Sequence, residues 1–487
     1  MSLLKKLVGQ TAIYGLSSIV GRLLNFLLVP LYTGIFAPEE YGVLSELMVV
    51  VAFAMVVLTY GFETAFFHFT NKENDSEKVL STGFTSLLTS SLLFLFIASN
   101  HSQNIANLLH IPEHPNFINW LVWILVLDVL TTLPFAKLRV CDRAWRFAFI
   151  RLTNITVNIG LNLFFFLLCP YLLKQEIALE IINGIYYPNV GIGYIFISNL
   201  IASSVMLILL SPEIFKLKFS FDFQIWKKMI KYGFPLLIGG LAYVTNEMVD
   251  RLLLEYLLPA NTATAQVGIY SACYKVAIFM SLFIQAFRYG AEPFFFAQAQ
   301  KKDAKEQYEI VMRYFIAFTA FIFLSINVFI DIIKHFIQDE AYHAGLDVVP
   351  ILLLANLFLG MYYNLSVWYK VSEKTRFGAY LSVAGATITI GLNILLIPTM
   401  SYMGSAWATL ICYASMCVMS YVFSRRHYPI SYNWKYISFY MISALSLFYI
   451  WTLWHDDHFI MSSLFCIIYI FSVVVLEKRK KISTFNL

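Results

Sequence analysis

Four charged residues stand close together inside one apolar stretch of the sequence, at about 233–258. They are Glu247, Asp250, Arg251 and Glu255. In a helix, Arg251 shares a face with Glu247 and with Glu255, because residues four positions apart are neighbours on the helix surface. Two interpretations are open. The group is either an internally neutralised structural cluster, or a switch in which Arg251 leaves its carboxylates to bind a phosphate or Asp250 takes up a proton.

Two further cations lie deep in apolar stretches, Arg22 near the start of the chain and Lys275 after the four-residue cluster. A charged side chain at the centre of a bilayer costs roughly 2.5–3.5 kcal/mol on insertion scales, so such residues usually mark a function. A guanidinium group binds phosphate oxygens in a bidentate manner. We expect Arg22, Arg251 and Lys275 to line the path of an anionic group. The alternative is that each cation pairs with a neighbouring carboxylate.

Two acidic residues occur singly in apolar stretches, Glu63 and Asp128. Burial raises the pKa of a carboxyl group, so either residue could bind a coupling proton or Na+. The carboxylates of Glu247, Asp250 and Glu255 could do the same. Glu63 or Asp128 could instead pair with Arg22, and the sequence does not decide between these roles.

Other clusters of reactive residues predict neither a metal centre nor a catalytic one. His110 and His114 flank Pro112, which opposes a continuous helix, and His455 and His458 fall in a short turn. The six cysteines lie in or beside apolar runs without a CxxC spacing, which is typical of small packing residues. A Walker-type phosphate loop is missing from the sequence. We therefore expect no cofactor and no direct use of ATP.

The composition shows which solvent surrounds these residues. Hydrophobic residues make up 59% of the 487 residues and charged residues 13%, and the mean hydropathy is +0.71. A soluble domain carries about 25% charged residues, so most of this surface must face lipid. Crossing a bilayer takes about 20 apolar residues per helix, and the sequence holds about fourteen such stretches. The approximate spans are 11–36, 42–69, 79–99, 117–137, 147–172, 191–211, 233–258, 268–296, 309–333, 347–369, 377–398, 402–423, 436–454 and 459–476.

The positions of lysine and arginine predict the orientation of these spans. If the N-terminus is cytoplasmic, nearly all of the 34 basic residues fall in or beside cytoplasmic loops, and the opposite loops hold only Lys174 and Lys334. Cytoplasmic loops of membrane proteins carry such an excess of positive charge. The chain is therefore predicted to be an all-α, multi-pass membrane protein with both termini in the cytoplasm. The net charge of +5 is explained by topology and does not indicate a nucleic-acid partner.

Short motifs recur in the same order in the two parts of the chain. Tyr14-Gly15 matches Tyr232-Gly233, and Ile159-Gly160-Leu161-Asn162 matches Ile390-Gly391-Leu392-Asn393. The motif Glu40-Tyr41-Gly42-Val43-Leu44-Ser45 likewise matches Val267-Gly268-Ile269-Tyr270-Ser271. Parallel repeats of this kind are typical of alternating-access transporters. We predict a six-helix half at 1–211, a cytoplasmic linker at 212–232, a second six-helix half at 233–423, and two extra helices with a basic tail at 424–487.

The ordered motifs also resemble those of a known family. The resemblance begins with Gly21-Arg22, Pro30 and Glu40-Tyr41-Gly42, and continues with Asp250-Arg251-Leu252, Gly268-Ile269-Tyr270-Ser271, Tyr274-Lys275, Lys374-Thr375, Gly391-Leu392-Asn393, Ile397-Pro398 and Gly404-Ser405-Ala406-Trp407-Ala408-Thr409. Over its whole length the chain is similar to polysaccharide-export flippases of the multidrug/oligosaccharidyl-lipid/polysaccharide superfamily.

The resemblance implies a fourteen-helix flippase in a bacterial inner membrane. Such a protein moves undecaprenyl-pyrophosphate-linked oligosaccharide repeat units, of O-antigen or capsule, to the periplasmic leaflet. Its partners would be the lipid-linked oligosaccharide, membrane lipid, and a polysaccharide polymerase with chain-length machinery. The alternatives are a drug/cation antiporter of the same superfamily, a lipid II flippase, and a membrane glycosyltransferase or polymerase. An enzyme is disfavoured because no outer loop exceeds about twenty residues, which leaves little room for an extracytoplasmic active site.

Overall fold

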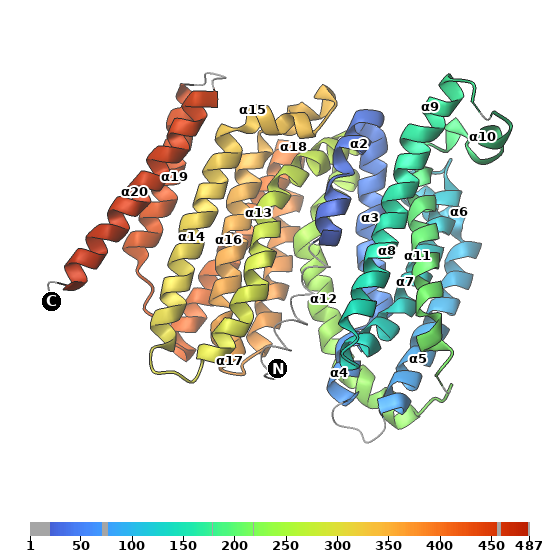
Figure 1. Cartoon of the computed structure of the whole chain (residues 1–487), viewed down its shortest axis with the longest axis horizontal. Helices are drawn as coiled ribbons and strands as arrows, with labels where there is room; N and C mark the ends of the chain where they lie inside the picture. The colour runs from blue at the N-terminus through green and yellow to red at the C-terminus, as the bar shows by residue number, and fades with distance from the viewer. Residues whose placement is uncertain (1–19, 71–75, 178, 218, 455–458, 486–487) are drawn as a thin grey trace. The chain divides into compact units, whose positions relative to one another are not determined.

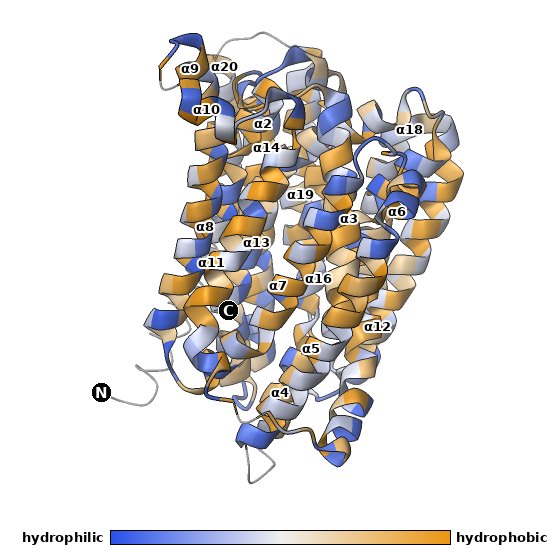
Figure 2. Ribbon diagram, turned by 90° about the vertical axis from the view of Figure 1, so that its right-hand side faces the viewer, coloured by the Kyte–Doolittle hydropathy of each residue, from blue (hydrophilic) through white to orange (hydrophobic). Residues whose placement is uncertain are grey.

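In the computed structural model, the described residues are 20–70, 76–177, 179–217, 219–454 and 459–485. These residues form helices and connecting turns, with no strand among them (Figure 1). The predicted all-α class is confirmed. Blue, hydrophilic residues are concentrated near turns and helix ends, for example around α6 and α4, while orange residues cover much of the helices (Figure 2). This distribution is that of helices built to lie in lipid.

The chain divides into two compact units, residues 1–36 with 43–244, and residues 37–42 with 245–487. The first unit contains a shorter apolar helix, Val20–Ile35. Its other elements are α2 (Val29–Ile35, the end of that helix), α3 (Pro38–Thr59) from residue 43 onward, α4 (Phe62–Thr70), α5 (Ser76–Asn100), α6 (Ser102–Leu108), α7 (Pro115–Val140), α8 (Ala144–Leu163), a π-helical turn (Phe164–Leu168), α9 (Cys169–Lys174), α10 (Leu179–Ile185), a 3-10 turn (Pro188–Val190), α11 (Gly193–Ile214) and α12 (Phe223–Leu257) up to residue 244.

The second unit takes the remainder of α12 and the first residues of α3. Its other elements are α13 (Ala263–Gln298), α14 (Ala304–Val328), α15 (Ile330–Ile333), 3-10 turns at Lys334–Phe336 and Glu340–Gly345, α16 (Val348–Leu365), α17 (Val367–Val371), α18 (Arg376–His427), α19 (Trp434–Leu453) and α20 (Phe459–Phe485). Helices α13, α14 and α16 pack against one another, and α19 and α20 pack on α14 (Figure 1). The sequence-based boundaries at 211, 232 and 423 stay a prediction.

Eleven helices in the described part are long and apolar enough to cross a membrane. One of them, α18, is 52 residues long and is divided by the non-helical residue Ser401. Two predicted spans fall outside the eleven, the shorter helix Val20–Ile35 and the 35-residue α12, which carries the charged cluster. With α18 counted as two legs, these helices account for the about fourteen spans expected from the sequence.

Two of the membrane helices have an irregular turn close to a proline. Pro398 lacks a backbone N–H, and three residues later Ser401 has a positive φ of 54°, so the first leg of α18 ends there. The second leg turns back closely: a Cβ atom on Gly404 would stand 2.6 Å from the carbonyl oxygen of Leu396. Pro170 follows a milder irregularity, because α8 widens into the π-helical turn Phe164–Leu168 just before it.

The linker after α11 belongs to the core of the first unit. Leu217, Ile225 and Met229 are buried in the same cluster as Phe62 of α4 and Leu133 of α7. Polar contacts hold the linker as well, because the hydroxyl of Ser81 bonds both backbone groups of Ser220. Five of the six cysteines are buried and all are unpaired, while Cys141 is exposed.

Candidate functional site

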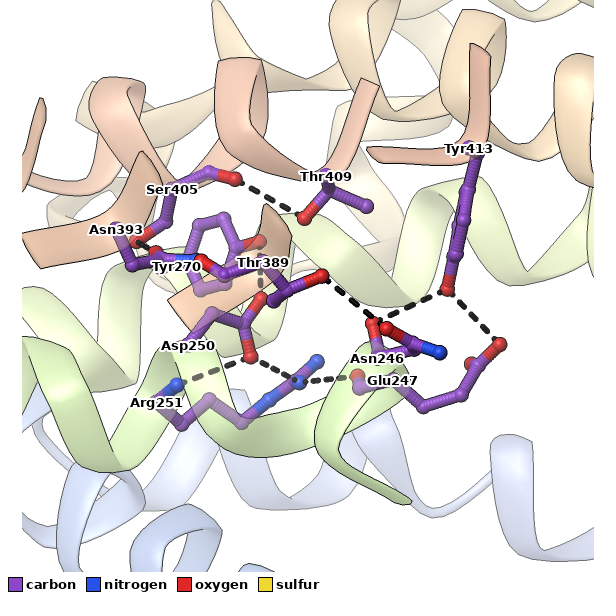
Figure 3. A network of polar contacts seen from close by, with 10 residues as sticks. All are labelled: Asn246, Glu247, Asp250, Arg251, Tyr270, Thr389, Asn393, Ser405, Thr409 and Tyr413. Atoms are coloured by element: carbon purple, nitrogen blue, oxygen red, sulfur yellow. Dashed lines mark hydrogen bonds and ion pairs between the residues drawn. The ribbon is translucent and has the colours of Figure 1, made fainter. Parts of the chain in front are cut away.

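The charged cluster of α12 is built around a buried ion pair in the second unit. The Nη1 atom of Arg251 donates to Oδ1 of Asp250 at 3.0 Å and to the backbone oxygen of Glu247 at 3.0 Å. Arg251 is 9% exposed and Asp250 is 3% exposed. A charge pair is stable at this depth only if hydrogen bonds satisfy its remaining atoms, and neighbouring helices supply them here (Figure 3).

Helix α13 provides the aromatic side of the pair. The hydroxyl of Tyr270 donates to Oδ2 of Asp250 at 2.6 Å, and Tyr270 is fully buried. The guanidinium carbon of Arg251 lies 4.5 Å from the ring centroid of Tyr274 and 5.6 Å from that of Tyr270. Both distances suit cation–π contacts. Arg251 is therefore held by one carboxylate and two rings, and the switch interpretation requires that these contacts be exchangeable.

Helix α18 holds the preceding turn of α12. The hydroxyl of Tyr413 donates to Oε1 of Glu247 at 2.9 Å, and that of Thr389 donates to Oδ1 of Asn246 at 3.3 Å. Gly385 favours this approach, because a Cβ atom there would stand only 3.1 Å from Nδ2 and from Oδ1 of Asn246. Figure 3 shows Tyr413 and Thr389 reaching Asn246 and Glu247. The cluster thus joins α12 to both legs of α18.

The sequence predicted that Arg251 shares a helix face with Glu247 and Glu255. In the structure, the side-chain oxygen of Glu247 accepts from Tyr413, and Oε1 of Glu255 accepts from Thr264 at 2.8 Å. Tyr413 lies 166 residues from Glu247. No local spacing rule could find this partner, whereas Tyr270 and Tyr274 were visible as part of the family resemblance.

Of the three predicted cations, Arg251 and Lys275 come together in the second unit. Lys275 follows Tyr274 on α13, is half-buried, and lies near enough to Arg251 to experience its like charge. Arg22 belongs to the first unit and has an exposed side chain. Their joint role as a path for an anionic group stays a prediction.

The two single acidic residues of the first unit have different surroundings. Asp128 of α7 is half-buried, and its Oδ1 accepts from the hydroxyl of Ser203 on α11 at 2.7 Å. Glu63 of α4 is more open and forms an ion pair with Arg139 at 2.6 Å, in which each side chain is 43% exposed. Asp128 therefore has the more desolvated carboxylate, which favours it over Glu63 as a site for a coupling ion.

One basic cluster lies outside the residues singled out in the sequence. Arg288 and Glu292 of α13 form an i, i+4 pair at 3.5 Å, and Lys370 of α17 binds the same carboxylate at 2.7 Å. Among the described residues, no group of three His, Cys, Asp or Glu side chains could hold a metal ion. The predicted turn with His455 and His458 lies outside the described residues.

Solved structures of membrane transporters share this fold. A structure of the lipid II flippase MurJ in an inward-closed conformation has a TM-score of 0.76 at 14% identity, over 96% of this chain and 99% of that chain. An inward-facing multidrug resistance MATE family transporter of the MOP superfamily has a TM-score of 0.67 at 12% identity, over 83% of this chain and 94% of that chain. An outward-facing one has a TM-score of 0.59 at 11% identity, over 87% and 95%. Identities this low establish the fold alone.

Sequence comparison establishes the family. No curated protein matches the chain in sequence. A family model described as polysaccharide biosynthesis protein matches residues 7–291, which is more than half of the chain. The resemblance found in the ordered motifs is thereby confirmed, and the chain belongs to this polysaccharide biosynthesis family.

Proposed function

We propose that the protein is a flippase for undecaprenyl-pyrophosphate-linked oligosaccharide repeat units. It would carry them from the cytoplasmic to the periplasmic leaflet of a bacterial inner membrane, with both of its own termini in the cytoplasm. The observation that carries this proposal is the family match over residues 7–291, which ties a transporter-like fold to polysaccharide biosynthesis. No chemical step on the glycan is needed, so the protein acts as a transporter and not as an enzyme.

The chemistry of the α12 cluster supports an anionic substrate. Arg251 and Lys275 place two cations near each other within one unit, and Asp250 neutralises one of them. A pyrophosphate that entered would offer Arg251 a stronger, bidentate partner than Asp250 does. Asp250 would then need another source of compensation, such as a proton, while Tyr270 stays within hydrogen-bonding distance of it. Exchange of Asp250 for the pyrophosphate at Arg251 would couple substrate binding to the protonation of Asp250.

Alternating access supplies the cycle for this exchange. The lipid tail would remain in the bilayer while the glycan crosses a hydrated path. An H+ or Na+ gradient would drive the cycle through a desolvated carboxylate, for which Asp128 is the first candidate in the first unit and Asp250, which is 3% exposed, in the second. Consumption of product by a polymerase on the outer leaflet would drive it in the same direction.

Deletion of the gene tests the proposal. Lipid-linked oligosaccharides are extracted from the deletion strain, identified by mass spectrometry and assigned to a leaflet by side-specific labelling. We expect complete single repeat units on the cytoplasmic leaflet, with loss of surface glycan, and rescue by the wild-type gene. Units that reach the periplasmic leaflet without being polymerised would contradict the proposal and favour a polymerase. An unchanged pool would contradict it as well.

A drug/cation antiporter is the second candidate, because MATE transporters share the fold. An antiporter that exports cationic drugs would place acidic and aromatic groups in its path, whereas Arg22, Arg251 and Lys275 are cations. Drug susceptibility of the deletion strain separates the two functions. A fall in the inhibitory concentration of several cationic dyes, with an unchanged pool of lipid-linked oligosaccharide, would favour the antiporter. A lipid II flippase would instead show accumulation of the cell-wall precursor.

A further inference from the structure

A second cationic cluster lies in the second unit, apart from Arg251. Glu292 of α13 offers a single oxygen, Oε1, to two cations: Nζ of Lys370 at 2.7 Å and Nη2 of Arg288 at 3.5 Å. The three side chains together carry a formal charge of +1. One carboxylate can neutralise only one of the two cations, so the cluster retains a positive charge.

The hydrogen bonding of Arg288 is incomplete. Its guanidinium carbon lies 4.2 Å from the ring centroid of Tyr363, so one face of the group is covered. Its Nε atom is buried and has no hydrogen-bond partner. A buried donor without a partner is destabilising, so the guanidinium keeps hydrogen-bonding capacity that its protein neighbours do not use. The planar edge of a stacked guanidinium is the part that binds phosphate oxygens in pairs.

The cluster is also accessible. The side chains of Arg288, Lys370 and Glu292 are 37%, 28% and 39% exposed, whereas that of Arg251 is 10% exposed. A ligand could therefore reach this cluster without first dismantling a buried network.

The position of the cluster suits capture of a substrate made in the cytoplasm. Helix α17, which carries Lys370, lies at the opposite end of the second unit from α15 (Figure 1). The positive-inside pattern predicts that this end faces the cytoplasm, because Lys301, Lys302 and Lys374 lie in the adjoining loops. Substrate units would meet this end of the protein before they enter it.

We propose that Arg288 and Lys370 form a docking site for the phosphate groups of a lipid head group, and that Glu292 occupies the site until the ligand displaces it. The proposal rests on the flippase function and adds an entry site to it. Two lipids carry the required chemistry, the diphosphate of the lipid-linked substrate and the phosphate of an ordinary anionic phospholipid. Glu292 makes the site selective, because a ligand must outcompete a carboxylate that is already in place.

Binding to the purified full-length protein tests the proposal. The probes are undecaprenyl diphosphate and phosphatidylglycerol, and native mass spectrometry or fluorescence in detergent measures the Kd of each. Loss of one charged hydrogen bond weakens binding by about tenfold or more. We expect about that loss with undecaprenyl diphosphate for Arg288→Gln and for Lys370→Gln. Lys301→Gln, on the exposed loop after α13, is the matched control and should leave the Kd unchanged.

Glu292→Gln should change the affinity in the opposite direction to the two cation variants. Removing the internal carboxylate should tighten binding of undecaprenyl diphosphate several-fold, and misfolding cannot produce a gain in affinity. If Arg288→Gln and Lys370→Gln weaken undecaprenyl diphosphate alone, the ligand is the substrate. Equal weakening of both probes assigns the site to phosphate head groups in general. Unchanged affinities in both cation variants, or weaker binding in Glu292→Gln, would overturn the proposal.

The deletion experiment keeps this inference separate from the proposed function. Cytoplasmic accumulation in the deletion strain, together with unchanged binding in the Arg288 and Lys370 variants, would reject the docking site and leave the flippase in place. An unchanged pool of lipid-linked units in the deletion strain would reject the flippase itself. Binding of phosphatidylglycerol alone at the site would then remain as a property of a different transporter.

Discussion

Gly42 of α3 and Gly268 of α13 each lie against a carbonyl oxygen of the other's helix. A Cβ atom on Gly42 would stand 2.0 Å from the oxygen of Thr264, and one on Gly268 would stand 1.8 Å from the oxygen of Pro38. Thr264 precedes Gly268 by four residues, and Pro38 precedes Gly42 by four residues, so the two contacts are reciprocal. Small residues allow helix backbones to approach this closely in a membrane. All four residues belong to the second unit.

This contact predicts that Gly42→Ala and Gly268→Ala are destabilising. The obstructing atoms are backbone oxygens, which cannot rotate away as a side chain would. We expect each variant to lose about 1–3 kcal/mol of stability, the usual cost of overpacking. A denaturant titration of the purified protein in mixed micelles measures the loss.

Gly290→Ala is the matched control for these variants. Gly290 lies on the same helix as Gly268, and a Cβ atom there would meet nothing within 4 Å. Alanine favours a helix over glycine by about 1 kcal/mol, so this variant should be neutral or slightly more stable. Equal stability of Gly42→Ala and the wild type would show that the helices can separate without cost.

The sequence repeat predicts that matched residues have similar surroundings. Asn162 and Asn393, matched by the motif Gly-Leu-Asn, are both fully buried. The side-chain nitrogen of each donates to the backbone oxygen four residues earlier, at 2.8 Å in both cases. The oxygen of each accepts from a hydroxyl, that of Tyr32 for Asn162 and that of Ser405 for Asn393. Hydropathy was thus sufficient to place most of the spans, and the two asparagines have similar surroundings, while the division into two repeated halves stays a prediction.

The partners of the charged residues could not be predicted in the same way. The i, i+4 rule describes a helix surface that faces solvent, whereas Asp250 and Arg251 lie on a buried face of α12. Asp250 therefore binds Arg251 next to it and Tyr270 twenty residues later, while Glu247 binds Tyr413 of α18. The sequence identifies which charges lie in the membrane, but tertiary packing decides which hydroxyl satisfies each one.

The pair of Asp250 and Arg251 predicts a strong loss of stability when one partner alone is removed. Asp250→Leu would leave the guanidinium of Arg251 uncompensated at 9% exposure and would remove the acceptor of Tyr270. Breaking a buried pair in this way costs about 3–5 kcal/mol. The same denaturant titration measures the cost.

The double variant Asp250→Leu/Arg251→Leu completes a thermodynamic cycle. It removes both charges, so it should be more stable than Asp250→Leu although it lacks more native groups. The double variant should still fail to export glycan, because Arg251 is proposed to bind the pyrophosphate. If the loss of stability in the double variant equalled the sum of the losses in Asp250→Leu and Arg251→Leu, the ion pair would contribute nothing.

We predict that Asp128→Asn changes the gradient dependence of transport but has little effect on stability. Asp128→Asn keeps an oxygen that can accept the hydroxyl of Ser203, so the loss of stability should stay within about 1 kcal/mol. If Asp128 carries the coupling ion, transport into proteoliposomes should lose its dependence on an imposed H+ or Na+ gradient. Glu113→Gln, an exposed acidic residue in the loop before α7, should keep that dependence. A full gradient response in Asp128→Asn would move the coupling site elsewhere.

The carboxyl group of Asp222, just before α12, predicts how the stability of the protein changes in acid. The hydrogen bond from Lys78 holds the pKa of Asp222 below its ordinary value, and the backbone N–H of Ile225 acts in the same direction. A carboxyl group whose pKa is lower in the folded than in the unfolded protein stabilises the fold fully above its ordinary pKa. That contribution is lost as the pH falls through the lower, folded-state value.

The melting temperatures of the wild type and Asp222→Asn should therefore differ most at neutral pH and converge below about pH 4, since an unperturbed Asp titrates near 3.9. Lys78→Met removes the same bond from the other side and should reproduce this convergence. The change of this difference with pH should be confined to acid, because Lys78 keeps its charge throughout the range. A difference that stayed constant between neutral pH and acid would mean that the linker is held by the backbone bonds of Ser220 to Ser81 and not by the ion pair.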